Sequence, residues 1–347
     1  MSEADRLLKQ GITEYQSGNF QDALLSWQEA LVEYRKILER RKEGAALGNL
    51  GACYQALGDL PRAIDCYQQH KAIAQEIADV IGEGNALSNL ANAYYSLGEY
   101  HQAIAYMQQR LLIAQNSQDK QAEGQTLGKL RAAYLALGEE KIALLYRQHQ
   151  LEIARYLLGD NNNDLIAICK AISLNPDEDF VGADLSNLDL QYADLHKADL
   201  HDINLSNTNL TLADLSGVNL SNANLSNSCL VNANLSGANL NNANLTDADL
   251  RTNLSRANFK GANLTHANLN SAYLCLANLM GANLTDANLN NADLTSVNLT
   301  DALIVGAELK SAALTGAKVK NARFANNSGL SDALKQDLKE RGAIFDS

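Results

Sequence analysis

Residues 245–261 read LTDADLRTNLSRANFKG. The apolar residues of this stretch recur every five positions, except for one interval of four between Leu250 and Leu254. The same interval of five extends from Phe180 to Phe324, with 15 units before the shortened step and 15 after it. A helix has 3.6 residues per turn and odd spacing in a strand alternates between its two faces, so neither can keep these residues on one side.

The chain must therefore turn a corner in every five-residue unit. The central residue is Leu in 25 of 30 units and the residue two positions earlier is Ala in 22 of 30, so we expect both to point inward. The residue two positions after the centre is Asn, Gly or Asp in 20 of the 29 units that have one. These residue types tolerate the positive φ of tight turns, which predicts corners at this position.

These units resemble the pentapeptide-repeat family, whose motif A(D/N)LXX is present as ANLSG from Ala233, ANLTD from Ala243 and ANLTH from Ala262. The resemblance implies a right-handed quadrilateral parallel β-helix with four units per coil. Thirty units would make about 7.5 coils, or a rod of roughly 36 Å at ~4.8 Å per coil. At Arg251–Thr252 one corner residue is missing, and we expect the coil to continue. A tolerated deletion is the first interpretation, and a bend or partner contact is the alternative.

The chain before these units repeats with a period of 40. The copies are EGAALGNLGACYQALGDLPRAI from Glu43, EGNALSNLANAYYSLGEYHQAI from Glu83 and EGQTLGKLRAAYLALGEEKIAL from Glu123. Their leucines and tyrosines are spaced three and four apart, which places them on one helical stripe. A glycine then ends each first helix and a second helix follows. The copies resemble the 40-residue tetratricopeptide repeats of kinesin light chain, which implies an α-solenoid of stacked helical hairpins.

The two kinds of repeat predict an α plus β repeat protein with two main domains. We expect the helical-repeat domain over residues 1–160, a capping helix and linker over 161–177 and the β-helix over 178–326. A C-terminal capping helix and tail should follow over 327–347, with Ser331 as its N-cap. Caps are expected because an open end of the rod would expose unpaired strand backbone and an apolar core, which invites end-to-end association.

Composition limits the partners and the location of the chain. Residues 1–175 carry 21 acidic and 17 basic side chains (−4), and residues 176–347 carry 19 and 11 (−8), which sum to −12. Phosphate contacts need Lys and Arg, so we expect no nucleic-acid partner. The sequence contains no run of 18 apolar residues, so we expect no membrane insertion. The first residues also lack the apolar segment of a signal peptide. Five widely spaced cysteines without a CxxC pair are typical of a reduced, cytoplasmic protein.

Signatures of catalysis are missing from the sequence. It contains no phosphate-binding loop, no nucleophile motif and no paired cysteine ligands. The interior of the expected rod is filled by Leu and Ala, which leaves no room for a substrate. His196 and His201 lie near Asp199 and Asp202, but they belong to adjacent sides of the rod, so exposed histidines are favoured over a metal site. We therefore expect a non-enzymatic protein without a cofactor or a metal.

The expected function is that of a protein–protein interaction scaffold. Stacked helical hairpins present a concave surface, and Asn49, Asn89 and Lys129 occupy equivalent positions on three first helices. In similar 40-residue repeats, asparagines at this position hold the backbone of an extended peptide. The resemblance thus implies a peptide-binding groove, in which Asn92 and Tyr95 would also lie. The alternative is that these asparagines bond to neighbouring loops. The partner would be an unidentified protein or peptide, and a monomer is favoured.

The rod offers a second candidate surface. Tyr192 and Leu212 are corner residues four units apart, so they should stack on one edge, and Val231 continues that edge. Such an apolar edge could serve as a docking surface. The alternative function is that of a DNA-mimicking regulator of DNA gyrase, which some pentapeptide-repeat proteins are. Mimicry requires carboxylates aligned along one side, whereas the aspartates here are spread over all four sides.

Overall fold

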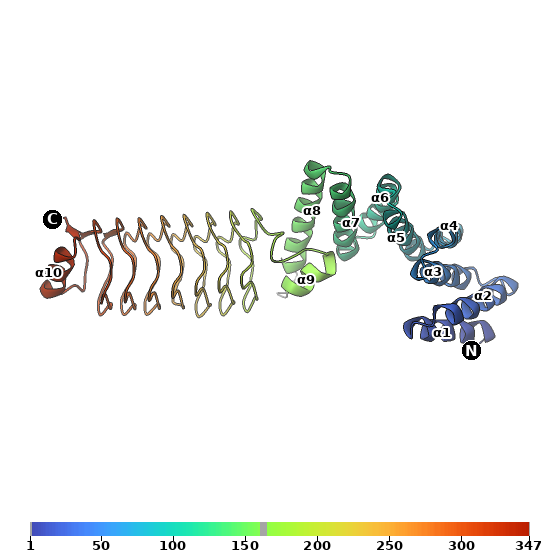
Figure 1. Cartoon of the computed structure of the whole chain (residues 1–347), viewed down its shortest axis with the longest axis horizontal. Helices are drawn as coiled ribbons and strands as arrows, with labels where there is room; N and C mark the ends of the chain where they lie inside the picture. Colours follow the sequence, from blue (N-terminus) through green and yellow to red (C-terminus); the bar gives the residue numbers. More distant parts are fainter. Residues whose placement is uncertain (1, 160–164, 347) are drawn as a thin grey trace. The chain divides into compact units, whose positions relative to one another are not determined.

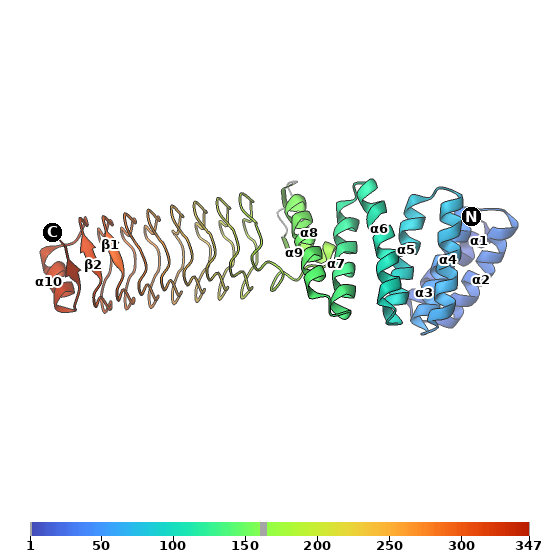
Figure 2. The same ribbon diagram turned by 90° about the horizontal axis from the view of Figure 1, so that it is seen from above.

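The computed structural model of the protein describes residues 2–159 and 165–346. It divides into two units, Met1–Gln150 and Leu151–Ser347, and each is described by itself. The first unit consists of α-helices stacked as successive hairpins (Figure 1). The second unit is dominated by a rod of stacked coils, which Figure 2 shows from above. The predicted fold class, an α-solenoid followed by a quadrilateral β-helix, is confirmed.

The helices of the first unit follow the 40-residue period. They are α1 (Glu3–Gln16), α2 (Phe20–Lys36), α3 (Arg40–Ala56), α4 (Leu60–Glu76), α5 (Val80–Ser96), α6 (Tyr100–Asn116), α7 (Lys120–Ala136) and the beginning of α8 (Glu140–Gly159). The predicted glycine ends are confirmed by positive φ angles at Gly18, Gly58, Gly98 and Gly138. The leucine stripe of each first helix is buried, as at Leu47, Leu87 and Leu127. The period of 40 thus fixes both the length and the packed face of each helix.

The rod consists of parallel coils whose equivalent residues are 20 positions apart in sequence, as in the pairing of Asn204 with Asn224. Central leucines such as Leu225 and Leu235 are fully buried, and so are most of the alanines two positions before them. The residue two positions after the centre has a positive φ of 53–69° in all 29 units that possess one, 14 before the shortened step and 15 after it. The predicted corner is therefore present throughout the rod.

The shortened step at Arg251–Thr252 leaves the coil continuous. Asn234 pairs with Asn253 at a separation of 19 residues, and the separation returns to 20 when Asn253 pairs with Tyr273. Thr252 stays buried and its hydroxyl donates a hydrogen bond to the carbonyl of Ala233. In neighbouring coils the equivalent carbonyl accepts a main-chain N–H, as Ala213 does from Asn234. The side chain of Thr252 thus compensates for the tighter path of the backbone.

The front of the rod is covered by the end of α8 and by α9 (Leu165–Ile172). One face of α9 is apolar and buried, and it comprises Leu165, Ile168, Cys169 and Ile172. Arg155 of α8 donates to the carbonyls of Asp184 and Ser186, over 2.8 Å and 3.0 Å. Within the rod, such carbonyls accept N–H groups from the preceding coil, so Arg155 replaces donors that the first coil lacks. Residues 161–164, where the expected capping segment begins, lie outside the described residues.

The back of the rod is covered by α10 (Asp332–Glu340) and a short strand, β3 (Ile344–Phe345). Ser331 caps α10 as predicted, and Leu338 is fully buried. Strand β3 pairs with β2 (Arg323–Ala325), which pairs with β1 (Leu303–Val305), and all are parallel. The apolar side chain of Ile344 is exposed, because strand pairing turns only Phe345 onto Phe324, with ring centroids 5.0 Å apart. Arg341 donates to the carbonyls of Leu314 and Ala317, over 3.3 Å and 2.9 Å.

We expect Leu225→Ala to lower the free energy of unfolding by about 2–5 kcal/mol, because a fully buried leucine between two coils leaves a cavity when truncated. Chemical denaturation monitored by circular dichroism measures the change. Lys260→Ala, at an exposed position of the rod outside the corners, is a control for loss of side-chain atoms at the surface. A Leu225→Ala protein as stable as the parent would show that the central leucines do not form the core.

A chain ending at Asn327 should form oligomers or precipitate, because it loses α10 and β3 and exposes the last coil. Light scattering after size-exclusion chromatography detects this directly. A truncated protein that stays monomeric, with the same melting temperature as the full chain, would mean that these elements do not protect the end.

Candidate functional site

A groove lies on the first unit between α3 and α5. Its volume is about 440 Å³, and Gly48, Asn49 and Ala52 of α3 line it together with Asn85, Ser88 and Asn89 of α5. Most of the lining residues are small or polar, because the helical stripe that carries Leu47 and Leu87 is buried elsewhere, and Ile81 is the one large apolar residue in the lining. The structure thus brings two of the predicted peptide-binding residues, Asn49 and Asn89, into one groove.

The carboxamides of Asn49 and Asn89 have no hydrogen-bond partner among the described residues, and the same is true of Asn92. All three residues are half-buried. An amide that bonded to a neighbouring loop would have a fixed partner, so the alternative interpretation receives no support. Each carboxamide can both donate and accept, which suits the alternating groups of an extended peptide backbone.

The other predicted residues do not line this groove. Asn92 lies one turn further along α5, and Tyr95 follows it with its ring edge against Tyr100, at a centroid distance of 5.1 Å. Lys129 lies on α7, half-buried, at the position equivalent to Asn89. These residues therefore extend the candidate surface along the unit rather than completing one pocket.

His70 of α4 lines the same groove and was not expected from the sequence, which favoured exposed histidines. Only 9% of its surface is exposed, and its Nδ1 has no hydrogen-bond partner. Gly44 and Gly48 make room for the imidazole, since a Cβ at Gly48 would lie 3.0 Å from Nδ1. Burial lowers the pKa of His70, with Asp79 acting in the opposite direction, so burial favours the neutral ring over the protonated one. It therefore offers an unused hydrogen-bonding atom beneath the groove.

A comparison of equivalent positions would have identified His70. Positions 30, 70, 110 and 150 are 40 residues apart and hold Ala30, His70, Arg110 and Gln150. The polar members lie against glycines of the first helix in the same hairpin. A Cβ at Gly84 would lie 3.2 Å from Nε of Arg110, and Gln150 donates to the carbonyl of Gly124 over 3.4 Å. The signal in the sequence is a polar residue that recurs at intervals of 40 positions and that lies against a glycine of the preceding helix.

The predicted docking residues of the rod lie on one edge. Tyr192 and Leu212 are 71% and 46% exposed, and Val231 is half-buried. Consecutive coils carry them, because the N–H of Tyr192 bonds to Thr211 and the N–H of Leu212 bonds to Val231. Both Tyr192 and Leu212 have positive φ, which is unfavourable for large side chains. The edge is thus a strained apolar ridge of the three residues.

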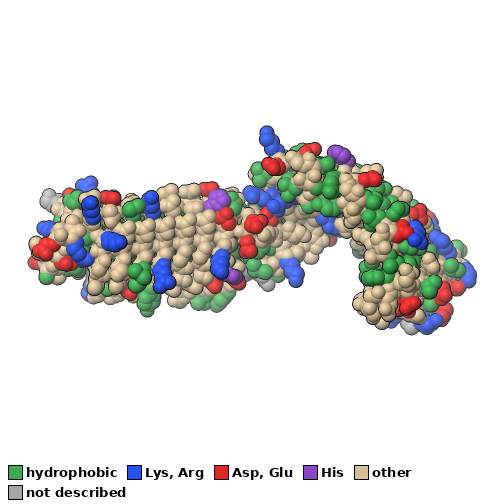
Figure 3. Space-filling view, viewed as in Figure 1, with side chains coloured by type: hydrophobic (Ala, Val, Ile, Leu, Met, Phe, Trp, Pro, Cys, Tyr) green, Lys and Arg blue, Asp and Glu red, His purple; other side chains and the backbone are tan. Residues whose placement is uncertain are grey.

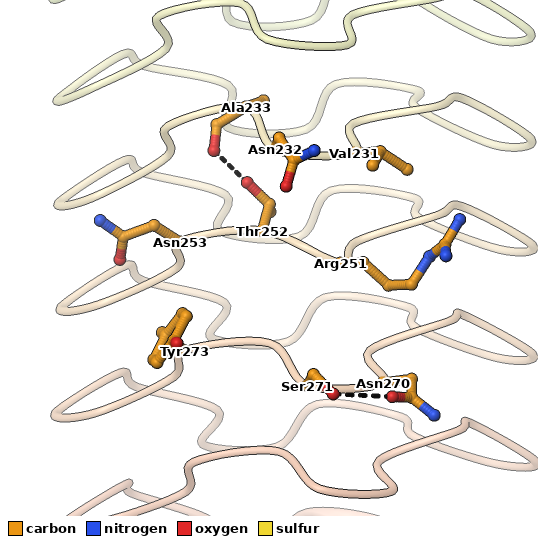
Figure 4. Close-up of a pocket in the computed structure, with 9 residues that line it drawn as sticks. All are labelled: Val231, Asn232, Ala233, Arg251, Thr252, Asn253, Asn270, Ser271 and Tyr273. Atoms are coloured by element: carbon orange, nitrogen blue, oxygen red, sulfur yellow. Dashed lines mark hydrogen bonds between the residues drawn. The ribbon is translucent and has the colours of Figure 1, made fainter.

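The ridge leads into a notch at the missing corner, with a volume of about 560 Å³ (Figure 4). Figure 4 shows Thr252 pointing toward Ala233, away from the side chains of Arg251 and Asn253. The notch is lined by Val231, Asn232, Ala233, Arg251, Thr252, Asn253, Asn270, Ser271 and Tyr273. Arg251 is already paired with Asp249 over 2.7 Å, and Tyr273 is largely exposed. The sequence signal for this notch is the interval of four residues, in place of five, between Leu250 and Leu254.

Two histidines of the rod pair with aspartates on their own units, whereas the third, His266, lies 4.0 Å from Asp286 of the next coil. Nδ1 of His196 lies 2.5 Å from Asp194, and Nδ1 of His201 lies 2.8 Å from Asp199. Within residues 2–159 and 165–346, no three His, Cys, Asp or Glu side chains gather as a metal site would require. In the same part of the chain, no helix has both the length and the apolar character needed to span a bilayer.

Models of known families match both kinds of repeat. The model described as pentapeptide repeats matches in overlapping segments over residues 179–326. Models described as tetratricopeptide repeat match residues 3–76 and 86–121. The search of curated proteins returns no match.

Several solved structures are similar to one of the two repeat regions. A pentapeptide repeat protein of Nostoc Pcc 7120, alr5209, is 32% identical over 30% of this chain and 84% of its own, with a TM-score of 0.27. The kinesin-light-chain TPR-like repeats of Podosopora anserina are 19% identical over 50% and 86%, with a TM-score of 0.43. The plasmid-mediated fluoroquinolone resistance protein QnrB1 is 20% identical over 48% and 90%, with a TM-score of 0.25.

Folding stability should fall with pH below about 6.5, because unfolded chains bind a proton at His70 more readily than the folded protein does. Replacing His70 by Gln, the residue at equivalent position 150, should remove that part of the decline. Urea unfolding at about pH 7.5 and about pH 5.5, followed through the helical signal, measures it. His101→Gln, at an exposed position on α6, is the matched control. An equal decline in the His70→Gln protein and the parent would contradict the burial of a neutral imidazole.

Proposed function

Because this chain belongs to the pentapeptide-repeat family and carries tetratricopeptide repeats ahead of its β-helix, we propose that it is a non-enzymatic scaffold for protein–protein interactions. Its helical groove binds a peptide segment of a partner. The rod acts as a rigid spacer or as a second docking surface.

The groove between α3 and α5 carries this proposal. It presents the free carboxamides of Asn49 and Asn89 at equivalent positions one repeat apart, in a channel whose small residues leave room for a peptide. An extended peptide rises about 3.3 Å per residue, so successive repeats can hold its backbone at regular intervals. Asn92, Tyr95 and Lys129 then continue the binding surface beyond the groove.

The ridge of Tyr192, Leu212 and Val231 is the proposed docking surface of the rod. Large exposed apolar residues at left-handed corners add no packing to the core, so their presence is better explained by a contact than by stability.

The proposal includes the organisation and setting of the protein. The helical-repeat domain covers residues 1–160, a capping segment 161–177, the β-helix 178–326 and the C-terminal cap 327–347. The protein works in the cytoplasm, needs no cofactor and binds a protein or peptide rather than nucleic acid. A monomer is favoured over an oligomer.

The alternative is a DNA mimic that regulates DNA gyrase through the β-helix. Figure 3 shows one face of the rod, on which acidic side chains are few, basic side chains are interspersed and most of the surface is uncharged. Asparagine side chains hydrogen-bond from coil to coil, as Asn239 does to Asn219 over 2.9 Å, where a DNA mimic would need carboxylates. The charge pattern therefore favours the scaffold.

A peptide selected from a random-sequence library on the full chain should bind at least about tenfold more weakly when Asn89 and Asn92 are both replaced by Ala, because two carboxamide contacts are lost. Fluorescence anisotropy measures the affinity, and circular dichroism checks that the variant is folded. Asn116→Ala, at an exposed position of α6, is the control. Undiminished binding by the double variant would move the interaction away from the groove, and inhibition of gyrase supercoiling by the full chain would favour the alternative.

A further inference from the structure

The corner that is missing between Arg251 and Thr252 leaves main-chain groups of the rod without partners. In complete coils the N–H of the corner residue donates to a carbonyl of the next coil, as Asn232 does to Arg251 over 3.1 Å. Asn270 holds the position one coil after Arg251, and its carbonyl accepts no hydrogen bond from any described residue. The N–H that would reach it belongs to the corner residue that the chain lacks.

The N–H of Thr252 has lost its partner for the same reason. Elsewhere in the rod the residue that follows a corner donates to the central residue of the preceding unit, as Ala257 does to Leu254 over 3.1 Å. Thr252 follows Leu250 by two positions instead of three, and its N–H makes no such bond within the described part of the rod. The hydroxyl of Thr252 satisfies the carbonyl of Ala233, but nothing satisfies this buried residue's own N–H. Polar groups without partners destabilise the folded state, so the shortened step lowers the stability of the rod.

The side chains around the shortened step also depart from the repeat. The residue before the central one is Asn or Asp in 22 of the 24 units between residues 184 and 298, and the exceptions are Cys229 and Tyr273. Cys229 lies one coil before Asp249, and Tyr273 lies one coil after Asn253. The two exceptions therefore flank the missing corner, so three departures from the repeat gather at one place.

Tyr273 removes a further hydrogen bond from the rod. An Asn or Asp at this position accepts the N–H of the residue two positions later, as Asp293 does from Thr295 over 3.0 Å. Tyr273 cannot accept in this way, and the N–H of Cys275 has no partner among the described residues. The ring is 62% exposed, so it adds little to the buried apolar surface. Local departures that lower stability without a gain in packing are typical of functional sites.

We propose that the notch at the missing corner binds the carboxamide of an Asn or Gln side chain of a protein partner. The inference rests on the proposed docking surface of the rod and names the chemistry that its partner presents. The NH2 group of a carboxamide donates to the carbonyl of Asn270, and its oxygen accepts from the N–H of Thr252. The ligand thus takes over a hydrogen bond of the missing corner residue, and the exposed ring of Tyr273 contacts it at the rim of the notch.

Other ligand chemistries fit the notch less well. A carboxylate or phosphate has no donor for the carbonyl of Asn270, and an ammonium group has no acceptor for the N–H of Thr252. A hydroxyl carries both functions on one atom, whereas the two groups of the notch belong to successive coils. Arg251 on the rim already pairs with Asp249 over 2.7 Å, so no uncompensated charge attracts an ion. A neutral group with a separate donor and acceptor is therefore favoured.

The carboxamide belongs to a protein because the notch continues the apolar ridge. Val231 lines the notch and is also part of the ridge, and Leu212 and Tyr192 lie on the two preceding coils. A partner segment that places an amide in the notch therefore lays its neighbouring apolar side chains on the exposed Leu212 and Tyr192.

The decisive variant restores the corner by insertion of one Asn between Arg251 and Thr252. Asn232 and Asn291 hold equivalent corners, so the inserted residue suits the left-handed conformation. It supplies the N–H that Asn270 lacks and fills the notch. We expect a melting temperature above that of the parent, measured by circular dichroism. A folded insertion variant that melts at or below the parent temperature would overturn the inference, because the missing corner would then leave no unsatisfied groups.

Binding is tested with peptides from a random-sequence library, selected on the full chain and counter-selected on the insertion variant. Each notch-selected peptide should contain an Asn or Gln whose replacement by Asp or Glu weakens binding about tenfold in fluorescence anisotropy. Tyr273→Asn, which introduces the residue that Asn253 places one coil earlier, should also weaken binding, and it provides the test if the insertion variant does not fold. Lys260→Ala, on another side of the rod, is the control and should bind as the parent does.

Three results would overturn the inference. They are the absence of any peptide that distinguishes the parent from the insertion variant, selected peptides in which no carboxamide matters, and loss of their binding when Asn89 and Asn92 are replaced by Ala, which would place them in the helical groove. Leu212→Asn, with the residue of Asn232, tests the ridge separately. Peptides that need the notch and the carboxamide but tolerate Leu212→Asn would support the notch and contradict only the ridge as a docking surface.

Discussion

The left-handed corner in each five-residue unit is the constraint on which the rod depends. Positive φ at that position turns the chain so that the next central residue again points inward, and every unit that possesses the position has this conformation. Four such corners close a coil of 20 residues, which brings each N–H and C=O level with its partner in the next coil. Most corners hold Asn, Gly or Asp, and Tyr192 and Leu212 accept a strain of order 1 kcal/mol each.

The same pairing requirement explains the irregular places in the rod. Where a corner residue is missing, the hydroxyl of Thr252 satisfies the carbonyl of Ala233. Where the coils begin and end, Arg155 and Arg341 each donate to two carbonyls. Guanidinium groups suit this role because several fixed donors can reach neighbouring acceptors at once. The notch lined by Arg251 and Tyr273 arises from the missing corner and leaves the coil intact.

The repeats made the fold predictable: the interval of five requires a corner in every unit, and spacings of three and four within the period of 40 indicate helices. The resemblances to two repeat families then implied the β-helix and the α-solenoid, and the C-terminal cap was predicted from Ser331 and from the need to cover the end of the rod. The site was less accessible to sequence reasoning. Asn49 and Asn89 were found because the same residue repeats, whereas His70 and Arg110 were missed because only their polar character, opposite a glycine, is repeated. The placement of these two side chains depends on their packing against glycines of another helix. Ile344 was also not predictable, because strand pairing and not apolarity decides the direction of its side chain.

The proposed scaffold is defined by where its partner binds. The groove of the first unit, with the unpaired amides of Asn49 and Asn89 beside the buried His70, is the proposed peptide-binding surface. Hydrogen–deuterium exchange of the full chain, with and without a library-selected peptide, locates that surface most directly. Protection confined to α3, α5, α6 and α7 is the expected result. Protection on the ridge of Tyr192, Leu212 and Val231, with the helices unchanged, would contradict a peptide-binding helical groove.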